Sequence, residues 1–242
     1  DSARQCILRW FFASNSGTSM PTQSAADGTL IHSLAERFPC GPRSAVMDAL
    51  EEEIRAMGVD EGQAASKIHM DHLREMASAL GEYLEQSTQM ENCADPNGNV
   101  QVEVPFDVPI SSVHIRGRID RMEVEGQGVR IIDFKTGKKG NKTGAKKDPD
   151  HPQLALYQLA VEQLGYEVLG AELKYLGYGD VRTISQDPLD PETRADWISQ
   201  LDEIGQKMKG PSFIATPSDE ACQYCEFARS CPAREQGKRS VE

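Results

Sequence analysis

Two stretches with the composition of β-strands, at 112–124 and 129–135, are joined by the short sequence EGQGV, and this arrangement predicts a tight hairpin. Gly126 at the first position of a two-residue loop suits a type II′ turn. Such a turn fixes the register of the two strands, because loop length and turn type set which residues face each other. The facing pairs that this register predicts are Val124 with Val129, Met122 with Ile131, Asp120 with Asp133, and Arg118 with Lys135.

The predicted hairpin places two carboxylates on one face of a strand pair, about 5 Å apart between Cβ atoms. Asp133 lies in the otherwise apolar run Ile131–Phe134, and a buried charge is costly unless it is compensated. Repulsion between Asp120 and Asp133 is relieved by a proton or a bound cation, and Lys135 lies about 7 Å further along the same face. The alternative is a pair of surface carboxylates on a solvated edge. Two Asp and a Lys on one face favour metal-assisted phosphodiester hydrolysis with Mg²⁺ or Mn²⁺.

The remaining pattern predicts an α/β fold with a mixed sheet. The helical segments expected from apolar spacing are 28–38, 43–57, 61–88, 150–164 and 191–209, with Asp150 as the N-cap of the fourth and Pro152 in its first turn. The further strands expected are 100–110 and 168–178. No run of 18 apolar residues is present, so we expect no membrane span.

A lysine-rich segment departs from the acidic balance of the chain. The net charge of −12 argues against nonspecific binding of nucleic acid over the whole surface, yet residues 135–147 hold six Lys and no acid. One interpretation is a solvated loop, and the other is a basic flap beside an anionic substrate. For the flap, the candidate DNA-binding residues are Lys138, Lys139, Lys142, Lys146 and Lys147.

The six cysteines, at positions 6, 40, 93, 222, 225 and 231, include a Cys-x₂-Cys-x₅-Cys cluster near the end of the chain. Three disulfides are one arrangement open to six cysteines. The opening residues show no secretory signal, which points to a reducing compartment where clustered thiols bind metal. Three thiolates leave one ligand missing from a four-cysteine site, and the spacing alone leaves zinc and iron–sulfur both open.

The hairpin motifs, GRIDR followed by DFK 13 residues after its Asp, resemble the RecB-like branch of the PD-(D/E)XK nuclease superfamily. Ile119 stands where the superfamily name has Pro. QLALY resembles the QxxxY motif with Gln153 and Tyr157, and GTLIH resembles the GxxxH motif with His32. Glu103, in VEVPF, also matches a family pattern, without an assigned role.

This resemblance implies a restriction-endonuclease-like core, with a mixed central sheet flanked by helices, and a divalent metal site. The metal ligands that it implies are His32, Asp120, Asp133 and the backbone carbonyl of Phe134. It further implies that Lys135 serves the attacking water and that Gln153 and Tyr157 steer the DNA backbone.

The opening sequence ARQCILRWFF is similar to the start of RecB-like iron–sulfur nucleases. The resemblance implies that Cys6 joins Cys222, Cys225 and Cys231 around a [4Fe-4S] cluster that staples the two ends of the chain, with Zn²⁺ as the alternative. Cys40 is the reserve fourth ligand, and Cys93 has no role.

We therefore expect a single nuclease domain over 1–242, with a helical part at 1–90, an α/β core at 100–209 and a Cys-rich tail at 210–242. The motifs most resemble the nuclease domain of an AddAB/AdnAB-type helicase–nuclease, which implies a single-stranded DNA exonuclease in double-strand-break repair, located in the bacterial cytosol or nucleoid. The missing initial Met favours a segment of a larger polypeptide with a helicase partner. The alternatives are a stand-alone CRISPR-associated type of iron–sulfur nuclease and a non-catalytic scaffold that binds DNA ends.

Overall fold

The computed structural model describes residues 2–16, 22–86, 93, 99–137, 145–177, 179–223 and 225–238. The chain divides into two compact units. Unit 1 contains Asp1–Met20, Pro109–His114 and Pro191–Glu242, and unit 2 contains Pro21–Val108 and Ile115–Asp190. Lys138, Lys139 and Lys142, three of the lysines predicted to bind DNA, lie outside the described residues.

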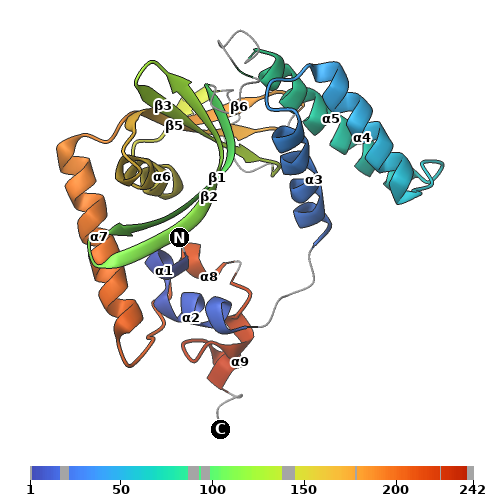
Figure 1. Ribbon diagram of the computed structural model, residues 1–242. Helices are drawn as coiled ribbons and strands as arrows, with labels where there is room; N and C mark the ends of the chain where they lie inside the picture. Colours follow the sequence, from blue (N-terminus) through green and yellow to red (C-terminus); the bar gives the residue numbers. More distant parts are fainter. Residues whose placement is uncertain are drawn as a thin grey trace. The chain divides into compact units, whose positions relative to one another are not determined.

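The strands form one six-stranded sheet in the order β1-β2-β3-β5-β6-β4 (Figure 1). Their bounds are β1 Val100–Ile110, β2 Val113–Glu125, β3 Gly128–Lys135, β4 Ala145–Lys147, β5 Glu167–Tyr175 and β6 Arg182–Gln186. β3 runs antiparallel to β2 and parallel to β5, while β6 runs antiparallel to β5 and parallel to β4. The predicted α/β class with a mixed sheet is confirmed.

The hairpin between β2 and β3 has the predicted register. Val124 pairs with Val129 and Met122 pairs with Ile131. Gly126 adopts φ 65°, the positive φ that a type II′ turn requires at its first central position. The regular backbone pairs end at Arg121 and Ile132. Asp120 and Asp133 are the next residues along the two strands, immediately beyond the last regular pair.

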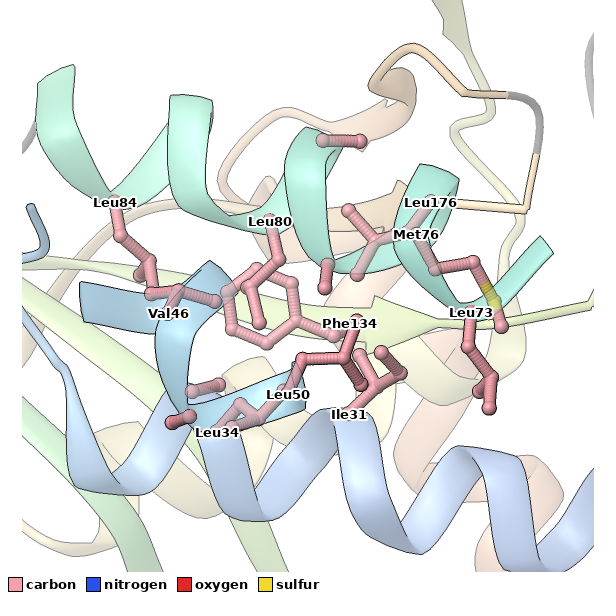
Figure 2. Packing of buried hydrophobic residues seen from close by; sticks show 14 of the residues in the cluster. Ile31, Leu34, Val46, Leu50, Leu73, Met76, Leu80, Leu84, Phe134 and Leu176 are labelled. Carbon is pink, nitrogen blue, oxygen red and sulfur yellow. The ribbon is translucent and has the colours of Figure 1, made fainter. Parts of the chain in front are cut away.

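Three helices of unit 2 cover one face of the sheet: α3 Gln23–Arg37, α4 Arg43–Met57 and α5 Ala64–Gln86. Their apolar side chains form a buried cluster that takes in Ile132 and Phe134 of β3 (Figure 2). Side chains alternate between the faces of a strand, so the packing of Ile132 and Phe134 into this cluster turns Asp133 toward the opposite face.

The opposite face is covered by α6, Pro152–Gln163, which connects the parallel strands β3 and β5 through the chain that also forms β4. The N-cap of α6 is His151 and not Asp150 as predicted, because the imidazole of His151 accepts the Leu154 N–H at 3.5 Å. Pro152 begins the helix, where its missing N–H costs nothing. This start sets Gln153 and Tyr157 on the first turns of α6.

Two strands of the sheet were not predicted. The expected strand at 168–178 ends at Tyr175, and the chain returns as β6, which has only five residues. β4 has three residues, two of them lysines, at the edge of the sheet. Neither strand is long enough or apolar enough to show a periodic signal.

Unit 1 brings the two ends of the chain together. It contains α1 Ser2–Gln5, α2 Ile7–Asn15, α7 Pro191–Lys209, α8 Asp219–Cys222, a 3₁₀ turn at Ala228–Ser230 and α9 Glu235–Lys238. Phe11 of α2 stacks on Phe213 with ring centroids 4.4 Å apart, and Phe12 packs on Phe227 at 5.5 Å. The Thr216 hydroxyl donates to the backbone carbonyl of Gln5 at 2.9 Å. The aromatic residues of α2 therefore pack against residues of the C-terminal tail.

Cys40 and Cys93 form a disulfide with Cα atoms 6.0 Å apart. The prediction of Cys40 as a reserve metal ligand is therefore wrong, because its sulfur is already bonded. No helix in the described part of the chain is long and apolar enough to cross a lipid bilayer.

Candidate active site

His32, Asp120 and the backbone of Phe134 meet at the end of the β2–β3 ladder. His32 lies on α3, with Nε2 3.1 Å from the Phe134 carbonyl oxygen and Nδ1 3.4 Å from Asp120 Oδ2. The same Asp120 oxygen accepts the Phe134 N–H at 2.7 Å. One carboxylate thus joins a helix to two strands, and it fixes the imidazole beside a backbone carbonyl.

Glu103 of β1 is the third side chain of this cluster. Ligand atoms of His32, Glu103 and Asp120 all lie within 4.8 Å of one another. Glu103 adopts φ 51°, a left-handed conformation that is uncommon for a residue with a side chain and that recurs at functional sites. This kink interrupts the strand alternation and turns the carboxylate to the site. The sequence pattern marked Glu103 without a role, since a backbone kink leaves no signal in residue types.

Asp133 is only 2% exposed and faces α6. Its Oδ1 accepts hydrogen bonds from Gln153 Nε2 at 2.7 Å and from the Tyr157 hydroxyl at 2.9 Å. Its Oδ2 forms an ion pair with Lys135 Nζ at 2.5 Å. Besides this contact with Lys135, a carboxylate oxygen has lone-pair capacity for a further electropositive partner.

Burial, a hydrogen bond and neighbouring charges raise the pKa values of three groups of the site. The pKa of Asp133 is raised by burial and then by the negative charge of Asp120, against the opposing effect of Lys135. The pKa of His32 is raised by its hydrogen bond to Asp120, although burial opposes this. Burial also raises the pKa of Tyr157, so its hydroxyl remains a donor. A site that concentrates negative charge in this way is suited to a cation.

The donor set fits a hard divalent cation. Two carboxylates, one imidazole and a backbone carbonyl are ligands that Mg²⁺ and Mn²⁺ accept. Neighbouring ligands of an octahedral ion at about 2.1 Å are about 3 Å apart, and the His32 nitrogen and Phe134 oxygen are separated by 3.1 Å. An open pocket adjoins these donors, and its lining is Ala25, Gly28, Thr29, His32, Ser33, Glu36, Glu103 and Asp120.

The other predicted site residues have different surroundings. Arg118, predicted to face Lys135, forms an ion pair with Glu103 at 3.2 Å. Lys147 forms an exposed ion pair with Asp187 at 2.7 Å, and Lys146 pairs with Ile184 along the edge strand β4.

The four free cysteines of unit 1 line one cavity. Cys6, Cys222, Cys225 and Cys231 surround it together with apolar residues and the side chains of Arg9 and Arg234. Burial raises the pKa of the Cys6 thiol, but hydrogen bonds from Thr216 and from backbone N–H groups of α2 outweigh this, and the net pKa is lowered. In the described chain no three of these thiols come within 4.8 Å of one another.

A model of the PD-(D/E)XK nuclease superfamily matches residues 1–232, and the chain belongs to this superfamily. The curated relatives include the Gene 69 protein of Mycobacterium phage L5, which is 26% identical over 152 residues, covering 61% of this chain and 49% of that protein. The Gene 69 protein of Mycobacterium phage D29 is 25% identical over 142 residues, covering 57% of this chain and 49% of that protein. The chain spans about half the length of these relatives.

A solved structure titled "Crystal structure of SSO0001" aligns with 94% of this chain and 94% of its own, at 16% identity and a TM-score of 0.38. That score is too low to support an argument. The superfamily, the fold and the nuclease class therefore depend on the family match and on the site geometry.

Proposed function

We propose that this chain is a divalent-metal-dependent DNA nuclease that hydrolyses phosphodiester bonds, with single-stranded DNA as substrate and exonucleolytic action. The observation that carries the proposal is the placement of three metal-donor side chains, His32, Glu103 and Asp120, next to the Asp133–Lys135 ion pair. A cation site alone is common. A cation site with a half-buried ammonium group beside it is an arrangement suited to phosphodiester hydrolysis.

In this proposal His32, Glu103, Asp120 and the Phe134 carbonyl hold Mg²⁺ or Mn²⁺, with Asp133 Oδ2 as a further ligand. The bound ion supplies Lewis-acid polarisation of the phosphate and a more acidic water. Lys135, which forms an ion pair with Asp133, donates hydrogen bonds to the attacking water and to the charge that develops on phosphate oxygens. Gln153 and Tyr157 hold Asp133 by two hydrogen bonds, so in this chain their role is to orient a carboxylate as well as to guide the DNA backbone.

The cysteine cavity is proposed to hold a [4Fe-4S] cluster that links the two ends of the chain. The support for a cluster over zinc is the resemblance of the opening sequence and the cysteine spacing to RecB-like iron–sulfur nucleases, together with the single cavity that Cys6, Cys222, Cys225 and Cys231 line. The binding energy of such a group contributes directly to the stability of unit 1.

The biological setting proposed is double-strand-break repair and recombination in the bacterial cytosol or nucleoid, with a helicase domain or subunit as partner. The support is the resemblance of the motif set to AddAB/AdnAB-type nucleases, together with the strongly acidic chain, which leaves the main grip on DNA to a partner. The proposed flap lysines, Lys138 to Lys147, would attract phosphates locally.

The test is cleavage of end-labelled single- and double-stranded DNA with and without Mn²⁺. Asp133→Ala and Lys135→Ala are expected to abolish Mn²⁺-dependent cleavage while the circular dichroism spectrum is unchanged. Lys67→Ala removes an exposed ion pair to Asp71 of 2.9 Å outside the site and is the matched control. Full cleavage by purified Lys135→Ala protein would refute the proposed function.

A further inference from the structure

Strand β2 carries two arginines that approach the metal donors in steps of two residues. Arg116 and Arg118 precede Asp120 by four and two residues on this strand. Their side chains are 77% and 62% exposed. Residues two apart on a strand are separated by about 7 Å, a spacing comparable to that of successive phosphates along an extended single strand.

Contacts within unit 2 fix Arg118 next to the candidate metal site. Its Nη1 lies 3.2 Å from Glu103 Oε2, and Glu103 contributes a ligand atom to the cluster with His32 and Asp120. The guanidinium of Arg118 therefore contacts a carboxylate that is itself a candidate metal ligand, so it lies near the position where a scissile phosphate would bind. Arg116, one step further out, pairs with Asp107 through Nε at 2.9 Å.

Both arginines keep donors for a further acceptor. A guanidinium carries five N–H groups in a planar fork that matches a phosphate, and each described ion pair uses one nitrogen. Exposed pairs of this kind contribute little to stability, so a phosphate competes for them easily. A divalent cation at Glu103 would also neutralise the carboxylate that holds Arg118.

The overall charge makes such local cations necessary. At a net charge of −12 the chain repels a polyanion on average, and Lys135 is already paired to Asp133. A phosphodiester that approaches His32 and Asp120 therefore needs positive charge on the path. Among the described residues, the outward-facing side of β2 supplies that charge next to the site.

We propose that Arg116 and Arg118 are successive phosphate contacts for single-stranded nucleic acid, forming a track along β2 that leads into the metal site. This inference rests on the proposed function and deepens it. The track reads the backbone and not the bases, because guanidinium–phosphate contacts carry no sequence information. Glu103 has two roles in this arrangement: it holds Arg118 in the free protein, and it contributes to the cation site.

The test is the salt dependence of binding of a fluorescein-labelled oligothymidylate, measured by anisotropy with the full chain in Ca²⁺ at several NaCl concentrations. Each phosphate contact contributes a slope of about −0.7 in log K against log salt for single strands. Arg118→Ala and Arg116→Ala are each expected to reduce the slope by about 0.7. Arg118→Lys is expected to keep the salt slope of the wild type, because the positive charge is retained. Asp107→Asn removes the ion pair to Arg116 and is expected to tighten oligothymidylate binding.

Arg37→Ala is the matched control, because Arg37 pairs with Glu53 at 3.2 Å with both side chains partly exposed. Three results would refute the proposed phosphate track. They are an unchanged salt slope in Arg118→Ala, an equal change of slope in Arg37→Ala, and no oligothymidylate binding by the wild type. Cleavage is measured separately with Mn²⁺. Arginine-dependent binding without cleavage would refute the nuclease and leave the track, whereas cleavage with an unchanged Arg118→Ala slope would refute the track alone.

Discussion

The carboxylate of Asp120 accepts the backbone N–H of Phe134 at 2.7 Å, just beyond the last regular pair of the β2–β3 ladder. The Asp120 side chain thus forms a hydrogen bond between β2 and β3 beyond the point where the regular backbone pairs end. It also leaves the Phe134 carbonyl oriented toward His32 Nε2, at 3.1 Å. Asp120 therefore combines a structural hydrogen bond with the role of a proposed metal ligand.

This double role separates two substitutions at Asp120. Asp120→Asn retains an acceptor for the Phe134 N–H, whereas Asp120→Ala leaves that buried donor unpaired at a cost of about 1–3 kcal/mol. We expect the alanine variant to unfold at lower urea concentration than the asparagine variant, with both inactive. The measurement is urea unfolding in EDTA. Equal midpoints would show that the Phe134 hydrogen bond contributes no stability.

Gly117 on β2 gives a second prediction, because a Cβ there would lie 2.5 Å from Phe106 Cζ. The Phe106 ring packs edge-on against Tyr157 with centroids 6.1 Å apart, and Tyr157 donates to Asp133. Gly117→Ala is expected to displace this aromatic pair, with a loss of about 1–3 kcal/mol from overpacking and a lower kcat at unchanged KM.

The control for this prediction is Gly137→Ala, since nothing lies within 4 Å of a Cβ at Gly137. Thermal unfolding and cleavage kinetics are measured for both variants. The Gly117→Ala effect on kcat should be much smaller in a Tyr157→Phe background. An undiminished effect in that background would mean that Gly117 does not act through Tyr157.

His151 predicts a pH dependence of stability. Burial lowers its pKa from the usual value near 6.5, so the unfolded chain binds the proton more readily than the folded chain. Stability is therefore lost as pH falls through about 6.5, and it is fully present above that value. His151→Asn keeps an N-cap acceptor without titrating. The free energy of unfolding of the wild type minus that of His151→Asn should be smaller at pH 5 than at pH 8. The same difference at both pH values would contradict the lowered pKa of His151.

The cysteines give a fourth prediction. Anaerobically purified protein is expected to be brown, with absorbance near about 400 nm from an iron–sulfur centre. Cys6→Ser should lose the iron, whereas Cys40→Ser should keep it, because Cys40 is bonded to Cys93. The measurements are iron and zinc content, and free thiols in the denatured, unreduced apoprotein. Four thiols are expected; zinc without iron would refute the cluster, and six thiols would refute the disulfide.

The sequence predicted those features that short-range rules determine. The EGQGV turn set the hairpin register, and apolar spacing set the helices at 43–57 and 191–209 to the residue. The α6 start was misplaced by one residue, because an imidazole and not the preceding carboxylate caps it. Helix caps depend on local backbone angles that composition does not fix.

The features that were missed depend on contacts through space. β4 and β6 are short polar strands that exist because neighbours pair with them. The Cys40–Cys93 bond joins positions 53 residues apart. Glu103 lies beside the candidate metal donors His32 and Asp120 and adopts a left-handed backbone conformation at φ 51°. Each of these features depends on contacts or backbone angles of the folded chain, which residue types along the sequence do not determine.

The proposed nuclease activity depends on the binding of a divalent cation by the side chains of His32, Glu103 and Asp120. Isothermal titration of the full chain with Mn²⁺ tests this most directly, with Asp120→Asn, Glu103→Gln and the control Asp202→Asn, a carboxylate of unit 1, measured in parallel. We expect the wild type and Asp202→Asn to bind Mn²⁺ equally, and the two site variants to bind at least about tenfold more weakly, as loss of a charged ligand requires. Equal Mn²⁺ affinity in Asp120→Asn and the wild type, or no binding by the wild type, would contradict the assignment of this site.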